Sequence, residues 1–573
     1  MQVICQIKYW TAGCRGRRKI VALVSRYRET GNCIWNRGGG GVQAVRESLN
    51  ASLAEYEPLM LVVAAMATCF LLFIVTSTVS SAVVVLSDHG LISTITMIAF
   101  RFIKLIPGAN DYIKKEQAKV IDKLQSSAKA EKLCWASELP GEGLGPLVLE
   151  QMKEIKSRDK HWQGHCSGAV YIGGNESEGH FALVNEAYSI FSHTNPLHPD
   201  LFPSIARFEA EVVAMTAAML GSKSKSSGGQ VCGNMTSGGT ESILMAVKST
   251  RDFMRATRGI TAPEMIIPES AHSAYDKAAQ YFEIKLRRAP VTSDFHADVK
   301  AIKRLINKNT IMIVGSAPGF PHGIIDPIEE IAALALQFGI CMHVDLCLGG
   351  FVLPFAQKLG YPIPPFDFQV PGVTSISVDV HKYGLAPKGT STVLYRNHEL
   401  RQVLTEWSGG LYISPSMAGS RSGGLIAGAW AAMMSLGENG YMEIVRKLME
   451  TSKKIEAGIK KIEGLYVLGK PEMTVIAFGS RDIDIYKIND VMASKGWSLN
   501  ALHKPSSVHI CITLQHVDIV DDFLNDLAAA VTTVRENPGK FEDGMAPIYG
   551  AAAKMPDRGT VRDILVAYMD STC

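Results

Sequence analysis

The stretch Ser377-Val378-Asp379-Val380-His381-Lys382 closes an apolar run, and Tyr383-Gly384-Leu385-Ala386-Pro387-Lys388-Gly389 follows it directly. Upstream, another apolar run ends in His343-Val344-Asp345. Apolar runs of this length that end in polar residues are typical of buried strands in a parallel sheet. Ligands bind at the carboxyl ends of such strands. The pattern therefore predicts that Asp345 and Lys382 lie together at one edge of a sheet.

A glycine-rich stretch lies further upstream, Thr236-Ser237-Gly238-Gly239-Thr240-Glu241-Ser242, before a helical run over residues 243–258. Small residues let the backbone approach an anion closely, and the free N–H groups at a helix N-terminus carry partial positive charge. We expect Gly238 and Gly239 to hold a phosphate group, helped by the hydroxyl of Ser237 or Thr240. Taken alone, the stretch fits an ordinary helix cap equally well.

A phosphate cradle, a carboxylate and a lysine in this order predict a site for pyridoxal phosphate (PLP). The Lys382 amine would bond to the cofactor aldehyde, and Asp345 would keep the pyridine nitrogen protonated. Lys382 then needs a depressed pKa, which we expect from burial and from the neighbouring cofactor. His272, in a small-residue turn, is expected to stack on the ring, and His381 to contact the phosphate. The alternatives are a helix-capping Asp345, a surface Lys382, and a His272 that lies at the surface or is satisfied within the core.

Two loops offer further candidates. Lys388 follows Lys382 by six residues in a Gly/Pro-bounded loop. It either binds a substrate phosphate, transfers protons or is simply solvated. The loop Ala418-Gly419-Ser420-Arg421-Ser422-Gly423-Gly424 carries one arginine. We expect it to complete an anion site, in the same subunit or in a neighbouring one.

The composition is that of a globular protein. The chain has 573 residues, of which 47% are hydrophobic and 20% charged, and its net charge is +3. This length suffices for two or three domains, and the small charge gives no reason to expect a nucleic-acid partner. The 11 cysteines are scattered without a CxxC pair, so we predict no metal site and a reducing compartment.

Short apolar strand-like runs alternate with helical ones from residue 207 onward, which predicts an α/β fold with a mostly parallel sheet. The expected strands cover 265–268, 282–287, 311–315, 341–346, 375–379 and 392–395. Past residue 440 the pattern favours a smaller α+β domain, with a helix over 441–462, strands near 473–479 and 508–513, and a helix near 517–534. The predicted divisions are a tail 1–58, a transmembrane helix 59–86, a juxtamembrane helix and linker 87–146, an N-terminal segment of the core 147–200, a large cofactor-binding domain 201–424 and a small domain 425–573.

Residues 59–86 contain no charged side chain. A helix of about 20 apolar residues crosses a bilayer, so we predict a single transmembrane span rather than a buried core helix. Lys and Arg close to the span lie mainly on its C-terminal side, which places the bulk of the chain in the cytosol. Residues 91–106 are expected either to lie along the membrane surface or to form an ordinary connecting helix.

Several motifs together resemble the sphingosine-1-phosphate lyases, a membrane-anchored group of fold-type I PLP-dependent enzymes. They are SVDVHKYGLAPKG, NPLHPDLFPSIARFEAEVV, TSGGTESILMA, HVDLCLGGF and AGSRSGG. The resemblance runs from about residue 56 to near the C-terminus and implies a fold-type I transferase fold. It also implies a homodimer, the endoplasmic reticulum membrane and PLP as cofactor. Tyr171, Asn195 and His198 would line the site, with Lys388, His198 and Tyr171 in proton transfer and Ser420 beside the cofactor.

The chain departs from that pattern in three places. The first fifty residues have no recognisable counterpart, Leu346 stands where the family usually has Ala, and Phe320 stands where some relatives carry a tyrosine. The implied reaction is a retro-aldol cleavage of a phosphorylated long-chain amino alcohol to a fatty aldehyde and phosphoethanolamine. The alternatives are a PLP-dependent amino-acid decarboxylase and an inactive membrane scaffold with the same fold.

Overall fold

The computed structural model describes residues 138–401 and 413–537, together with the single helical residues Lys115, Ala118, Val566 and Met569. The predicted transmembrane run 59–86, the tail before it and residues 91–106 lie outside the described residues. Among the residues that are described, no helix is both long and apolar enough to cross a bilayer.

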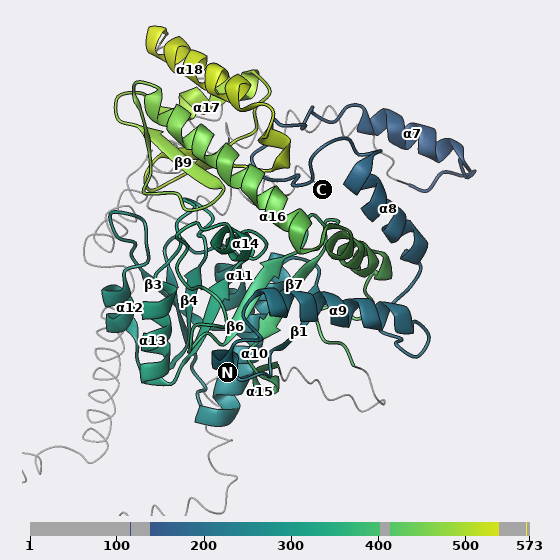
Figure 1. Ribbon diagram of the computed structural model, residues 1–573, viewed down its shortest axis with the longest axis vertical. Helices are drawn as coiled ribbons and strands as arrows, with labels where there is room; N and C mark the ends of the chain where they lie inside the picture. Colours follow the sequence, from purple (N-terminus) through teal and green to yellow (C-terminus); the bar gives the residue numbers. More distant parts are fainter. Residues whose placement is uncertain are drawn as a thin grey trace, which may run out of the picture. The chain divides into compact units, whose positions relative to one another are not determined.

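A seven-stranded sheet forms the centre of the large domain (Figure 1). Its strands are β1 (Cys232–Thr236), β2 (Glu264–Pro268), β3 (Lys285–Ala289), β4 (Thr310–Ser316), β5 (Cys341–Asp345), β6 (Ser375–Asp379) and β7 (Ser391–Tyr395). They lie in the order β1-β7-β6-β5-β4-β2-β3. Strand β7 runs antiparallel to both of its neighbours, and the pairs from β6 to β3 are parallel.

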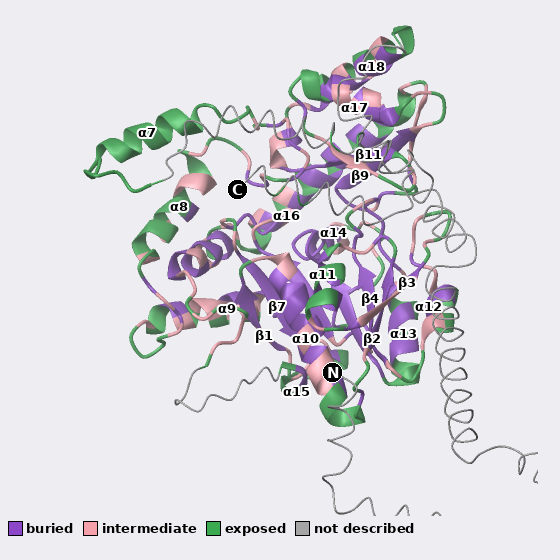
Figure 2. Ribbon diagram, turned by 180° about the vertical axis from the view of Figure 1, so that it is seen from behind, coloured by how far each residue is buried: buried purple, intermediate pink, exposed green. Residues whose placement is uncertain are grey.

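The interior strands are apolar because both faces of the sheet are covered. Every residue of β4, β5 and β6 is buried, and these central strands lie in the buried interior of the large domain in Figure 2. Helix α10 (Gly239–Arg258) packs against β6 and β7, and α13 (Ile328–Phe338) packs against β4 and β5.

The other described helices are α7 (Leu147–Lys156), α8 (Gly179–Phe191), α9 (Pro203–Met219), α11 (Ala274–Tyr281), α12 (Val299–Leu305), α14 (Leu353–Lys358), α15 (His398–Arg401), α16 (Gly423–Lys461), α17 (Ile485–Ser494) and α18 (Val520–Glu536).

A second sheet lies beyond α16. Its strands, β8 (Leu465–Val467), β9 (Val475–Ser480), β10 (Asn500–Leu502) and β11 (Ser507–Cys511), pair antiparallel in the order β10-β11-β9-β8. Helices α17 and α18 pack against each other, and an apolar cluster of its own, which includes Trp497 and Phe523, joins them to the sheet. Helix α16 contacts both parts and is interrupted at Gly437, whose φ of 58° favours glycine.

The predicted α/β fold is confirmed, with β7 making the sheet mixed. Strands β2, β4, β5, β6 and β7 lie where the sequence predicts them. Strand β3 begins three residues later than expected because α11 continues to Tyr281 and Phe282 caps it. Strand β1 was not predicted, since its sequence CGNMT has no apolar periodicity. The predicted domain boundaries stay predictions.

Candidate active site

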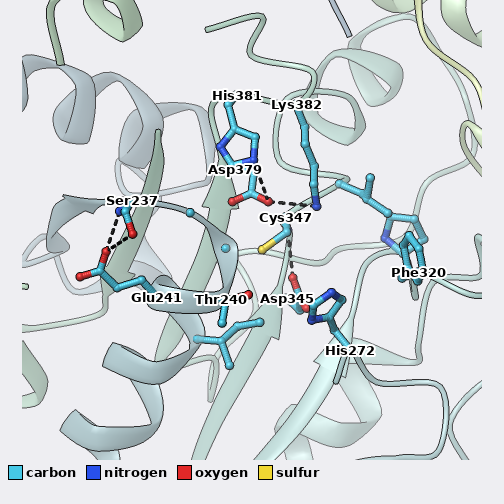
Figure 3. Close-up of a pocket in the computed structure, with 15 residues that line it drawn as sticks. Ser237, Thr240, Glu241, His272, Phe320, Asp345, Cys347, Asp379, His381 and Lys382 are labelled. Carbon is cyan, nitrogen blue, oxygen red and sulfur yellow. Dashed lines mark hydrogen bonds and ion pairs between the residues drawn. The ribbon is translucent and has the colours of Figure 1, made fainter. Parts of the chain in front are cut away.

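The carboxyl ends of β5 and β6 and the N-terminus of α10 surround a cavity of about 390 Å³ (Figure 3). The strands are in register, with Asp345 of β5 opposite Ser377 of β6, so their polar ends meet. Eight of the predicted cofactor residues line this one cavity: Ser237, Gly238, Gly239, Thr240, His272, Asp345, His381 and Lys382. The cavity also contains Glu241, Pro318, Phe320, Cys347, Leu348, Ile243 and Asp379.

The Lys382 amine is paired with a carboxylate. Its Nζ lies 2.9 Å from Oδ2 of Asp379, the last residue of β6, and the Asp379 side chain is only 3% exposed. Burial disfavours the charge on Lys382, but Asp379, followed by Cys347 and Asp345, more than compensates and raises the pKa of the amine above its ordinary value. The depressed pKa expected from the sequence is therefore wrong for the protein alone, because that expectation left Asp379 out.

Asp345 is fixed by contacts with the turn that follows its own strand and with the neighbouring strand β6. Its Oδ1 accepts hydrogen bonds from the Cys347 backbone N–H at 3.0 Å and from the Ser377 hydroxyl at 3.4 Å. Behind it, Nε2 of the fully buried His343 lies 3.1 Å from the Ser377 oxygen. These contacts hold the Asp345 carboxylate at the cavity wall. Figure 3 shows it beside Cys347 and His272.

His272 is half-buried at the cavity wall, as predicted. Its Nδ1 accepts a hydrogen bond of 3.1 Å from the backbone N–H of Ala274, so in the neutral ring the proton is on Nε2. Phe320 lies edge-on to it, with 6.0 Å between ring centroids. An imidazole held in this way presents a flat face that an aromatic cofactor can stack against.

In the glycine-rich cradle, one of the expected phosphate donors already has a partner within the protein. Gly238 is the N-cap of α10, and the helix begins at Gly239, so backbone N–H groups face the cavity as predicted. However, both the backbone N–H and the hydroxyl of Ser237 donate to Oε2 of Glu241, each at 2.6 Å. The Ser237 hydroxyl is thus engaged by the buried Glu241 carboxylate, and a phosphate contact from Ser237 or from Thr240 stays a prediction. Thr240 still lines the cavity.

His381 lies over the cradle, with its Cε1 3.8 Å from where a Cβ on Gly238 would stand. Its Nδ1–H donates to the carbonyl of Thr390 at 2.6 Å, and its Nε2 lies 3.9 Å from Oδ2 of Asp379. Burial lowers the pKa of the imidazole, against the opposing effect of Asp379. Because the neutral ring has no proton on Nε2, a contact to a phosphate requires His381 to be protonated.

Ser420 and Asn195 lie next to this cavity but do not line it. Ser420 and Arg421 line a neighbouring cavity of about 220 Å³, which shares Ser237 and Glu241 with the first. Nδ2 of Asn195 donates to the Ser420 hydroxyl at 3.0 Å. The Arg421 guanidinium forms a two-pronged ion pair with Glu209, at 2.6 and 2.9 Å, so it is not a free anion-binding group as expected.

Tyr171 and Lys388 form a pair of their own beyond the main cavity. Nζ of Lys388 lies 4.7 Å from the centre of the Tyr171 ring, and that ring meets Tyr383 edge-on. Although the Lys388 side chain is exposed, desolvation of its amine by the surrounding protein and then the charge of Lys382 lower its pKa to about 8. Burial raises the pKa of Tyr171 well above its ordinary value. His198 is exposed in the turn before α9, and neither cavity includes it.

The sequence reasoning missed the roles of Asp379 and Glu241. Asp379 stands in the first quoted stretch, and its position at the end of a strand, three residues before Lys382, is a signal that it faces the same cavity. Glu241 follows Ser237 by four residues across the start of a helix, the spacing at which side chains meet.

Comparison with known proteins identifies the family of this chain. The family model for the pyridoxal-dependent decarboxylase conserved domain matches residues 147–481, more than half of the chain. A sphingosine-1-phosphate lyase of Arabidopsis thaliana is 64% identical over 530 residues, which are 92% of this chain and 97% of the relative. The chain belongs to the sphingosine-1-phosphate lyase family.

Two further members of the sphingosine-1-phosphate lyase family support this assignment. The relative from Oryza sativa subsp. japonica is 63% identical over 533 residues, covering 92% of this chain and 98% of its own. The solved structure of a sphingosine-1-phosphate lyase from Burkholderia pseudomallei superposes with a TM-score of 0.68 at 41% identity, covering 72% of this chain and 96% of its own. The decarboxylase-like α/β fold is thus shown by both sequence and structure.

The residues of the cavity fit the cofactor of this family, PLP. The cofactor needs an amine, a carboxylate for its ring nitrogen, a flat group for its ring and N–H donors for its phosphate. Lys382, Asp345, His272 and the first turn of α10 provide these in one cavity. The cradle is also fitted closely, since a Cβ on Gly239 would stand 2.8 Å from both the Cys347 sulfur and Oδ2 of Asp379.

Proposed function

We propose that this chain is a PLP-dependent lyase that cleaves the C2–C3 bond of phosphorylated long-chain amino alcohols. The products are a fatty aldehyde and phosphoethanolamine, so the enzyme serves sphingolipid breakdown. The observation that carries this proposal is the single cavity containing Lys382, Asp345 and His272, in a chain that matches sphingosine-1-phosphate lyases over almost their full length.

Each cavity residue has a task in this reaction. Bound PLP supplies an electron-accepting ring, which takes up the electron pair released when a bond to the amine-bearing carbon breaks. Lys382 would hold the cofactor covalently, Asp345 would pair with its ring nitrogen, and His272 would hold the ring from one face. The amides of Gly239 and Thr240 at the start of α10 would hold its phosphate.

Proton transfer falls to the basic groups. C2–C3 cleavage requires loss of the proton from the 3-hydroxyl, and delivery of a proton to C2 completes phosphoethanolamine. With a pKa of about 8, Lys388 has a neutral fraction at physiological pH and can accept the hydroxyl proton. Tyr171 stays protonated because of its raised pKa, so it is better suited to orient Lys388 than to act as the base.

A homodimer is supported by the exposed apolar side chains of the N-terminal helices. Helix α7 has no buried residue, and its Val148, Met152 and Ile155 recur at helical spacing along one side. Figure 2 shows the whole helix as exposed. Sedimentation of the full-length chain tests the dimer, since a monomer at micromolar concentration contradicts it.

The proposed substrate and the sequence together support a proposed membrane location. The substrate and the aldehyde product are lipids, and residues 59–86 carry no charge. We propose a single-pass anchor in the endoplasmic reticulum membrane, with the catalytic part in the cytosol. Alkaline carbonate extraction and protease protection of microsomes test this. Release by carbonate, or protection of the catalytic part from added protease, contradicts it.

A second candidate function is amino-acid decarboxylation, which the name of the matching family model suggests. It requires a cation for the substrate carboxylate, yet the guanidinium of Arg421 is already paired with Glu209. Product analysis separates the two. The full-length chain with PLP and a phosphorylated sphingoid base should release aldehyde and phosphoethanolamine in equal amounts, without carbon dioxide. Carbon dioxide from an amino acid, with no aldehyde from the lipid, would contradict the lyase.

A further inference from the structure

Asp379 is the acidic side chain closest to the lysine amine on which the proposed chemistry depends. Its Oδ2 lies 2.9 Å from Nζ of Lys382, within hydrogen-bond distance. Because Asp379 is the last residue of β6, the sheet fixes its carboxylate, whereas Lys382 stands in the turn that follows. The carboxylate therefore determines where the amine points.

The surroundings favour a negative charge at this position. A Cβ on Gly239 would stand 2.8 and 2.9 Å from the two Asp379 oxygens, so the first turn of α10 packs directly against the carboxylate. The partial positive charge of that helix end stabilises an anion. Burial alone would raise the pKa of Asp379, but Lys382 and then His381 lower it, so the carboxylate is ionised.

The other charged and titratable groups near Lys382 do not replace Asp379. Asp345 and Cys347 approach from the end of β5, His381 from the same turn as Lys382, and Lys388 from the loop beyond it. Asp345 raises the pKa of Lys382 less than Asp379 does. Lys388 carries the same charge as Lys382, so it repels the ammonium and cannot serve as its partner. Without Asp379, a buried ammonium at Lys382 would lose its direct partner.

We propose that Asp379 is a positioning residue, the counter-ion that aims the Lys382 amine into the cavity and holds it there as an ammonium until the amine bonds to the cofactor. This proposal rests on the proposed role of Lys382 but not on the identity of the lipid substrate. The proposal explains why the Lys382 amine, which must react with an aldehyde, is paired so closely with an acid. As an ammonium, Lys382 does not react with other electrophiles, and the ion pair keeps it in position.

Amine labelling tests the counter-ion directly. The full-length chain, stripped of PLP with hydroxylamine, is treated with acetic anhydride over a range of pH, and acetylation of Lys382 is followed by peptide mass spectrometry. In Asp379→Asn, which keeps the size but removes the charge, the apparent pKa of Lys382 should fall by about one to three pH units. The Lys382 amine should then become more reactive at pH 8.

The matched control is Glu438→Gln, which removes the carboxylate partner of Lys358. Both residues are exposed, and neither lines the cavity. It should leave the labelling of Lys382 unchanged. A folded Asp379→Asn chain in which Lys382 labels as in the wild type would overturn the proposal. Since neither substrate nor turnover is used, this result is independent of whether the lyase activity is found.

A double-mutant cycle covers the case in which Asp379→Asn is unstable. Thermal unfolding is compared for Asp379→Asn, Lys382→Met and the double variant. If the two groups form an ion pair, Asp379→Asn should lower the melting temperature of the wild type but have little effect in the Lys382→Met background. An equal loss in both backgrounds would mean that Asp379 stabilises the strand end rather than the amine, and would contradict the proposal.

Discussion

Oε2 of Glu241 lies 2.6 Å from both the backbone nitrogen and the hydroxyl oxygen of Ser237. The other carboxylate oxygen, Oε1, accepts the backbone N–H of Met417 at 2.8 Å. One buried side chain thus joins the start of α10 to the loop that contains Ser420. Both oxygens act as acceptors, which a carboxylate can do and an amide cannot.

Glu241→Gln should therefore weaken PLP binding without unfolding the protein. The amide loses one of the two acceptors, and a hydrogen bond to a charged group contributes about 1.5–3 kcal/mol. We expect the dissociation constant of PLP to rise about tenfold or more. Fluorescence titration measures it, and hydrogen exchange of the peptide containing Met417 should speed up. Ser237→Ala removes only one donor and should have the smaller effect. Unchanged exchange and affinity in Glu241→Gln would rule out this coupling.

The two cradle glycines should respond differently to alanine. A Cβ on Gly239 would stand 2.8 Å from the Asp379 and Cys347 side chains, whereas the nearest atom to a Cβ on Gly238 is 3.8 Å away. Neither position requires a left-handed backbone, so the difference is steric. Gly239→Ala should lose most PLP binding and activity, and Gly238→Ala should keep both within a few fold. PLP absorbance and turnover measure the pair, and equal losses would contradict the packing described.

Lys388 should produce the ascending, low-pH limb of the pH profile. Its amine accepts a proton only in the neutral form, and its pKa is lowered to about 8, so kcat should rise with pH up to about that value and then level off. Lys388→Met should remove this limb and reduce kcat by about 10²–10⁴-fold, the usual contribution of a general base. Lys358→Met serves as the control for loss of a lysine. A limb that persists in Lys388→Met would assign the base elsewhere.

His322 should make the protein sensitive to acid. It is 6% exposed, and in the described part of the chain neither ring nitrogen has a hydrogen-bond partner. Burial lowers its pKa from 6.5 to about 4. The unfolded chain therefore binds more protons between these values, and stability is lost as the pH falls through this window, by about 2 kcal/mol between pH 8 and pH 5.

His322→Leu should remove that loss. We expect the variant to unfold at a higher temperature than the wild type, with the larger gain at pH 5 than at pH 8. Calorimetry at the two pH values measures this, with the exposed His193→Leu as the control. An equal gain at both pH values would show that His322 is not the titrating group.

Most of the cavity could be predicted from the sequence because its residues stand at the ends of apolar runs. Strand ends in a parallel sheet meet at one edge, so Asp345, Lys382 and His272 were brought together as expected. The start of α10 at Gly239 could also be predicted from the sequence, because small residues before an apolar helix are typical both of a helix cap and of an anion-binding site.

The electrostatics could not be predicted in the same way. The pairing of Lys382 with Asp379, and that of Arg421 with Glu209, depends on side-chain directions at the ends of separate elements. Sequence spacing gives proximity along the chain but not which of two nearby acids takes the contact. For the same reason Ser237 appeared free, although Glu241 uses both of its donors.

The most direct test of the account is to find which lysine carries the cofactor while turnover is measured. The full-length chain with PLP is reduced with borohydride, digested and examined by mass spectrometry, and the wild type is compared with Lys382→Ala and Lys388→Ala. We expect the cofactor mass on Lys382 in the wild type and in Lys388→Ala. Lys382→Ala should have neither bound cofactor mass nor aldehyde and phosphoethanolamine release. Cofactor mass on another lysine, or product release by Lys382→Ala, would contradict the account.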